Sequence, residues 1–113
     1  MKKFDLKSMT AHSYEERQKN VFYRKPEFKM RIIQLEPGEA IPECQMRAQV
    51  VFLCLEGQVE VAVNGEKTEL GEQQLLVAEP GLFSMKGLGR SRLLGIQIEC
   101  QEKVESAGPG VQG

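Results

Sequence analysis

The chain of 113 residues contains no tryptophan, one histidine and no Cys-x-x-Cys pair. Without such pairs, a structural zinc site of that kind is excluded. No apolar run approaches the roughly 18 residues that a membrane-spanning helix needs. Residues 1–7 are basic but lack the apolar stretch of a secretory signal. The three cysteines, Cys44, Cys54 and Cys100, are an odd number, which favours free thiols in a reducing compartment. We therefore expect a cytoplasmic protein.

The chain also lacks an excess of charge of either sign. Its 15 Lys and Arg residues oppose 16 Asp and Glu residues, which leaves a formal net charge of −1. This balance gives no electrostatic basis for binding nucleic acid or an anionic membrane, and we expect neither as a partner. Hydrophobic residues make up 41% of the chain, and its length fits one domain that can bury its own core.

From residue 21 onward the sequence has the pattern of many short strands. Val59, Val61 and Val63 alternate, and the Asn64-Gly65 pair that follows is typical of a two-residue hairpin turn of type I′. The apolar run over residues 50–55 has the length of a strand that is buried on both faces. Strands of this kind, separated by turn residues, predict an all-β sandwich or barrel.

A second strand pattern, over residues 28–35, leaves two interpretations open. Phe28, Met30 and Ile32 alternate, and the apolar phase then shifts to Ile33 and Leu35. Either both faces of this strand are buried or a bulge interrupts it.

The two ends of the chain differ from this pattern. We expect residues 1–20 to form a lead-in with a short helix, because Ser13 and Glu16 have the spacing of a capping box. Residues 21–104 would form the barrel. Residues 105–113 are rich in Gly, Ser and Pro, and we expect them to be disordered. The single histidine, His12, lies in the lead-in, either as an exposed loop residue or on an arm that reaches over a barrel mouth.

Residues 38–57 resemble the first motif of the cupins, in which two glycines enclose a His-x-His pair and a glutamate. Gly38 and Gly57 have the right separation, whereas Cys44 and Met46 occupy the His positions and Val50 the Glu position. The segment 71–86 resembles the second motif, with Leu82 at the position of its His and Lys86 at that of its Asn. The resemblance covers residues 21–100 and implies a single-domain, all-β, double-stranded β-helix (jelly-roll) barrel with a short N-terminal helix.

In metal-binding cupins, those three His and one Glu hold a divalent ion inside the barrel. None of the four positions has a His or Glu here, so we expect no cofactor, no catalytic residue and a largely apolar pocket. Alternate residues of a small barrel face inward, which defines the predicted ligand-binding lining. Its members are Cys44, Met46, Val50, Phe52, Leu82, Ser84 and Lys86.

Three functions fit this pattern. The first is a non-catalytic module that binds a small molecule, for which Lys86 would anchor a ligand carboxylate. The second is a metal-binding protein in which Cys44 and Met46 are soft ligands for copper(I) or zinc, with Met85 or His12 as a third ligand. It includes an enzyme that uses Cys44 and Met46 in soft-metal or metal-free chemistry. The third is a structural or interaction domain whose barrel is packed shut, since Cys and Met also pack as adaptable hydrophobes. The resemblance further implies a homodimer.

Overall fold

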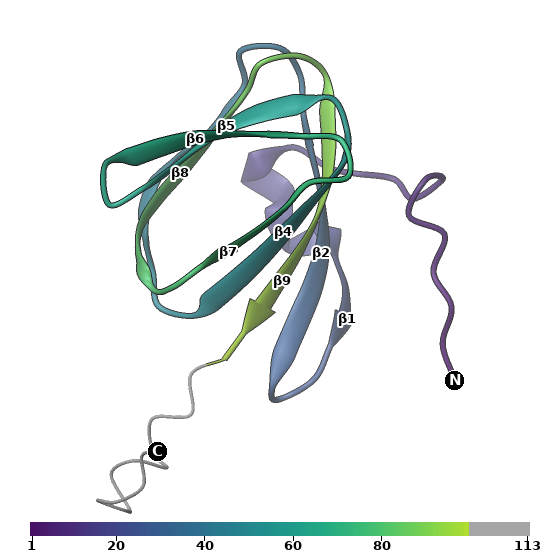
Figure 1. The fold of residues 1–113 in the computed structure, drawn as a ribbon. Coiled ribbons are helices and arrows are strands. Elements are labelled where there is room, and N and C mark those ends of the chain that lie inside the picture. Colours follow the sequence, from purple (N-terminus) through teal and green to yellow (C-terminus); the bar gives the residue numbers. More distant parts are fainter. Residues whose placement is uncertain (100–113) are drawn as a thin grey trace, which may run out of the picture.

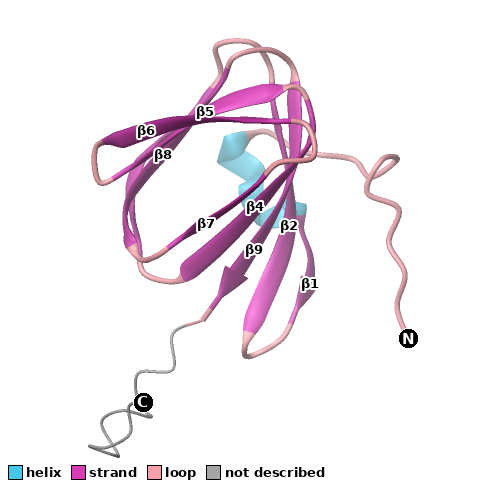
Figure 2. Cartoon of the chain, viewed as in Figure 1, coloured by secondary structure: helices cyan, strands magenta, loops and turns pink. Residues whose placement is uncertain are grey.

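The computed structural model describes residues 1–99, and within them one short helix precedes nine strands (Figures 1 and 2). The helix η1 spans Tyr14–Asn20. The strands are β1 Val21–Arg24, β2 Phe28–Leu35, β3 Ala40–Met46, β4 Gln49–Glu56, β5 Gln58–Val63, β6 Glu66–Gly71, β7 Leu75–Ala78, β8 Gly81–Gly87 and β9 Ser91–Ile98. The all-β prediction with a short N-terminal helix is confirmed. The predicted tail, 105–113, and the last residues of the predicted barrel lie outside the described residues.

The strands form two antiparallel sheets that face each other. The larger sheet has the order β1-β2-β9-β4-β7 and the smaller one the order β3-β8-β5-β6. Apolar side chains from both sheets form one core between them. The rings of Phe52 on β4 and Phe83 on β8 stack across this core, with centroids 5.2 Å apart. The two sheets therefore share one interior, as a sandwich does.

Residues with positive φ form the turns that connect successive strands. Asn64 and Gly65 both have positive φ, 52° and 86°, and connect Val63 to its partner Glu66. This confirms the type I′ hairpin between β5 and β6. Gly38 has a φ of 83°, and the Glu39 amide donates to the Glu36 carbonyl at 2.9 Å, which closes the turn before β3.

Strand β2 resolves the two interpretations of its pattern. Its pairing with β9 runs unbroken over the whole strand, so no bulge interrupts it. Ile32 and Ile33 are both buried, so both faces are covered there. Strand β4 differs from the prediction, because Val50, Phe52 and Cys54 are buried on its inner face whereas the residues between them are only half-buried.

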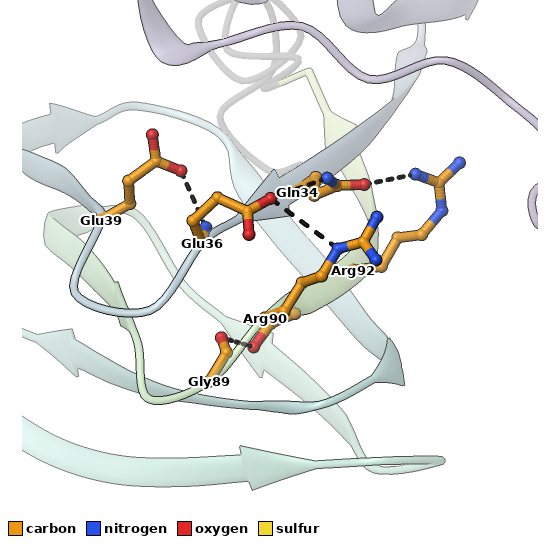
Figure 3. Close-up of polar contacts among 7 residues, drawn as sticks. Gln34, Glu36, Glu39, Gly89, Arg90 and Arg92 are labelled. Carbon is orange, nitrogen blue, oxygen red and sulfur yellow. Dashed lines mark hydrogen bonds and ion pairs between the residues drawn. The ribbon is translucent and has the colours of Figure 1, made fainter.

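The lead-in is attached to the barrel by two buried polar side chains. Asn20 accepts a hydrogen bond from the His12 amide at 2.7 Å and donates one to the His12 carbonyl at 3.0 Å. Arg92 on β9 donates to Gln34 at 2.8 Å (Figure 3). It also donates to the carbonyls of Leu6 and Met9. These bonds hold the lead-in at two separate points.

The predicted capping box is absent from η1. Ser13 makes no side-chain cap, and the Glu16 amide instead donates to the Ser13 carbonyl at 2.9 Å. The helix is of the 3₁₀ type and kinks at Glu16, so the first turn lacks the α-helical geometry that a capping box needs. Within residues 1–99, no helix has the length and apolar character to cross a membrane.

Candidate functional site

A cavity of about 220 Å³ lies between the two sheets, and η1 forms part of its mouth. Strands β2, β3, β4, β8 and β9 supply its walls. Its apolar lining consists of Ile33, Leu35, Ile41, Cys44, Met46, Val50, Phe52, Phe83, Gly95 and Ile96. Its polar lining consists of His12, Tyr14, Arg17, Gln18, Asn20, Arg31, Gln34 and Gln97.

The structure brings four of the predicted lining residues together. Val50 and Phe52 on β4 are 3% and 5% exposed, and both line the cavity. Cys44 and Met46 on β3 are half-buried and line the opposite wall. All four side chains therefore line one cavity, while their role in ligand binding stays a prediction.

The other three predicted lining residues lie outside this cavity. Leu82 is 43% exposed, and Lys86 is exposed as well. The side chains that face inward from β8 are those of Phe83 and Met85, which are 3% and 1% exposed. The expectation that Leu82, Ser84 and Lys86 face the interior is therefore wrong by one residue. Strands alternate with a period of two, so an error of one residue moves every side chain to the other face.

Phe83 takes the inward place that the second motif assigned to Leu82. It pairs with Cys44 across β3 and β8, and its ring stacks on Phe52. The two rings form the floor of the cavity. Met85 is buried in the same core but does not line the cavity.

The sequence interpretation missed the polar part of the cavity. Arg31 on β2 shares its inward phase with Ile33 and Leu35, and this shared phase is the signal by which it was predictable. Arg17 and Tyr14 on η1 line the mouth, as does His12. His12 therefore lies on an arm over the barrel mouth, which was the second of the two interpretations.

Positive charge dominates this mouth. Burial lowers the pKa of Arg31, and the nearby charges of Arg17 and Arg24 lower it further. Arg17 donates to the Tyr14 carbonyl at 2.9 Å, and its guanidinium lies 4.1 Å from the centre of the Tyr14 ring. This stacking orients Arg17 at the rim.

The usual metal ligands of the cupins are missing from this interior. Val50 and Phe83 carry no donor atom, so two of the four family positions supply nothing to an ion. Within residues 1–99, no group of three or more His, Cys, Asp or Glu side chains lies close enough together to hold one. The residues present do not fit the family's four-ligand metal.

Searches against protein-family models and curated proteins find no match for the sequence. Solved structures do match. A protein from Thermus thermophilus is 22% identical, with a TM-score of 0.73 over 87% of this chain and 97% of that one. A cupin domain from Schizosaccharomyces pombe is 20% identical, with a TM-score of 0.67 over 82% of this chain and 69% of that one.

A cupin superfamily protein from Desulfitobacterium hafniense is 17% identical, with a TM-score of 0.66 over 71% of this chain and 74% of that one. At such identities the likeness establishes the fold alone. It agrees with the fold that the motif between Gly38 and Gly57 implied. The chain therefore has the fold of the cupin superfamily.

Proposed function

We propose that this protein is a cytoplasmic, non-catalytic module that binds a small molecule between its two sheets. The observation that supports this is the cavity of about 220 Å³, with an apolar floor and a polar rim. Ligand pockets combine apolar walls with a few polar groups that orient the ligand. The free thiols of Cys44 and Cys54 agree with a reducing compartment.

The size of the cavity limits the ligand. A volume of about 220 Å³ is less than the roughly 300 Å³ at the lower end of typical ligand pockets. It is much larger than the voids of a close-packed core, which rarely exceed one water molecule. A domain whose barrel serves only as a scaffold would be expected to fill this space. We therefore favour a ligand of few heavy atoms over a closed structural barrel.

Gly95 offers a direct test, because a side chain at this position would enter the cavity. A Cβ atom there would lie 3.3 Å from both Ile33 Cδ1 and Phe52 Cε1. Gly89 is the matched control, since a Cβ atom there meets nothing within 4 Å. The substitutions Gly95→Val and Gly89→Val therefore add the same atoms inside and outside the cavity.

The experiment is a thermal-shift screen against small organic acids, alcohols and sugars. A compound that binds only the native state raises the melting temperature, and at 100 times its Kd it adds about 2.7 kcal/mol of stability. We expect such a compound to stabilise the wild type and Gly89→Val but not Gly95→Val. The proposal fails if no compound stabilises the wild type, or if Gly95→Val responds equally.

One observation favours a second candidate, a soft-metal site. His12, Cys44 and Met46 all line the same cavity and supply one nitrogen and two sulfur donors. In this case, protein incubated with copper(I) and passed through a desalting column would retain one ion per chain, and Cys44→Ser would lose it. Retention of no copper by the wild type would exclude this candidate.

We also propose that the protein is a homodimer whose interface is the outer face of the larger sheet. On this face, Leu53 is paired with Leu94 and Leu75, and the next row is apolar as well. Leu75 and Val77 are 57% and 56% exposed. A twofold axis buries such a patch against its own copy. The neighbouring part of this face, at Arg92, is already covered by the chain's own lead-in. The part that stays exposed is therefore the part that a second copy of the chain would cover.

Sedimentation velocity tests this proposal with two variants that place the same charge on different sheets. Val77→Glu should convert the dimer to a monomer, because it buries an unpaired carboxylate in the interface. Leu82→Glu alters an exposed apolar residue of the smaller sheet and should leave the dimer intact. A monomeric wild type at tens of micromolar would contradict the proposal.

A further inference from the structure

Two guanidinium groups, from different elements, face the mouth of the apolar cavity. Arg31 lies on the inner face of β2, and Arg17 comes from η1, which packs beside β2. Their mutual repulsion is one of the causes that lower the pKa of Arg31. Two like charges at one opening repel each other, and this repulsion destabilises the folded protein. An anion bound between them would remove the repulsion.

Within residues 1–99, neither arginine forms an ion pair with a carboxylate. The ion pairs in this part of the chain involve His12, Lys19 and Arg90. The hydrogen bond of Arg17 is to a neutral backbone carbonyl, and no hydrogen bond from the Arg31 side chain is found among the described residues. The positive charge at the mouth is therefore not neutralised by the protein groups described.

Deprotonation of Arg31 does not relieve this repulsion. Its guanidinium remains charged at physiological pH even when its pKa is lowered, because an arginine side chain stays protonated in proteins. The planar guanidinium also presents paired N–H donors, which match the two oxygens of a carboxylate. The mouth is thus built for a planar anion, and the floor behind it is built for hydrocarbon.

We propose that the cavity binds a short-chain monocarboxylate, with its apolar chain on Phe52 and Phe83 and its carboxylate between Arg31 and Arg17. This inference rests on the proposed small-molecule binding and specifies its ligand class. Gly95 lies opposite Arg31 and lines the same cavity. The anchor therefore differs from Lys86, which lies outside this cavity.

Three probes of equal chain length separate the contribution of the ligand's charge to binding from that of its hydrocarbon chain. Isothermal titration with hexanoate, hexan-1-ol and hexylamine should give binding of hexanoate, about 10- to 100-fold weaker binding of hexanol, and no detectable binding of hexylamine. Acetate, which has the charge without the chain, should bind more weakly than hexanoate.

Two arginine variants test the anchor. Arg31→Met should weaken hexanoate binding to the level of hexanol and leave hexanol binding unchanged. Arg24→Gln is the matched control, because it removes a nearby positive charge from outside the cavity lining and should leave the preference for hexanoate intact. If Arg31→Met does not fold, Arg17→Gln should reduce the same preference, because it removes the second guanidinium of the mouth.

The outcomes distinguish this inference from the proposed function. Equal binding of hexanoate and hexanol to the wild type would overturn the carboxylate inference and leave an apolar binding pocket. Loss of the preference in Arg24→Gln as well as in Arg31→Met would replace a specific anchor with a general effect of net charge, and would also overturn it. Binding of none of the probes would overturn both the inference and the proposed pocket.

Discussion

Arg31 and Gly95 are direct partners in the antiparallel pair of β2 and β9. A Cβ atom on Gly95 would lie 3.5 Å from Arg31 Cγ and 3.3 Å from Phe52 Cε1. The absence of a side chain at Gly95 therefore lets the side chains of Arg31 and Phe52 pack closely over this position. A charged side chain on the inner face of a sheet, beside a cavity of about 220 Å³, is an arrangement that a packed core avoids.

The first prediction concerns the stability of the ligand-free protein. Arg31→Met should raise the free energy of unfolding by an amount on the order of 1 kcal/mol, because it removes a partly buried charge and keeps the apolar stem. Urea unfolding measures this, with the exposed Arg24→Met as control, which should change stability less. A clear loss of stability in Arg31→Met would identify Arg31 as a structural residue.

The second prediction concerns the attachment of the lead-in. Asn20 is 5% exposed and makes two hydrogen bonds to the backbone of His12. Asn20→Ala should therefore cost about 1–3 kcal/mol and increase amide hydrogen exchange in the lead-in. Gln18→Ala removes an exposed side chain of the same helix and should have little effect. Equal exchange in the two variants would contradict the role given to Asn20.

Local sequence signals were sufficient for much of the fold. The alternation of Val59, Val61 and Val63 and the pair Asn64-Gly65 predicted the β5–β6 hairpin, because both the strand period and the positive φ depend on residues close in sequence. The spacing from Gly38 to Gly57 was enough to bring Cys44, Met46, Val50 and Phe52 to one interior. The hairpin does not depend on contacts with distant segments.

The errors arose where the local pattern and the motif spacing disagreed. Motif spacing placed Leu82 inside, whereas the apolar alternation of Phe83 and Met85 beside Ser84 and Lys86 indicated the opposite phase. The alternation of apolar and polar side chains predicted the correct phase, because the hydrophobicity of each side chain determines which face of the strand is buried. The inward position of Arg31 was predictable from its phase, whereas its proximity to Arg17 was beyond local signals, because that proximity arises only when η1 packs beside β2.

The third prediction tests this corrected register. The four substitutions Cys44→His, Met46→His, Val50→Glu and Phe83→His place the donor set of metal-binding cupins on inward positions and should create micromolar or tighter binding of zinc or nickel. The matched quartet with Leu82→His in place of Phe83→His puts the third histidine on the outer face and should bind more weakly. Tighter binding by the Leu82→His quartet would contradict the register.

The fourth prediction concerns pH. Burial raises the pKa of the Cys54 thiol, and the charge of Glu72 acts in the same direction. The folded state therefore holds this proton above the pH at which the unfolded thiol loses it. The stability contribution is complete below the unfolded pKa of about 8.5 and is lost as pH rises toward the folded value.

Urea unfolding between pH 7 and pH 10 measures this effect. Above pH 8.5, the free energy of unfolding of the wild type should fall by up to about 1.4 kcal/mol per pH unit because of this group. The free energy of unfolding of Cys54→Ala should fall less. Cys44→Ala, which removes a half-buried thiol, serves as the control and should keep the slope of the wild type. If the free energy of unfolding falls with pH at the same slope in Cys54→Ala and in the wild type, Cys54 is not the source of the pH dependence.

The most direct test is a crystal structure of the protein grown with hexanoate. We predict electron density for the chain along Phe52 and Phe83, with the carboxylate against the guanidinium groups of Arg31 and Arg17. A cavity closed by its own side chains, or hexanoate bound elsewhere while Arg31 points to solvent, would contradict the account.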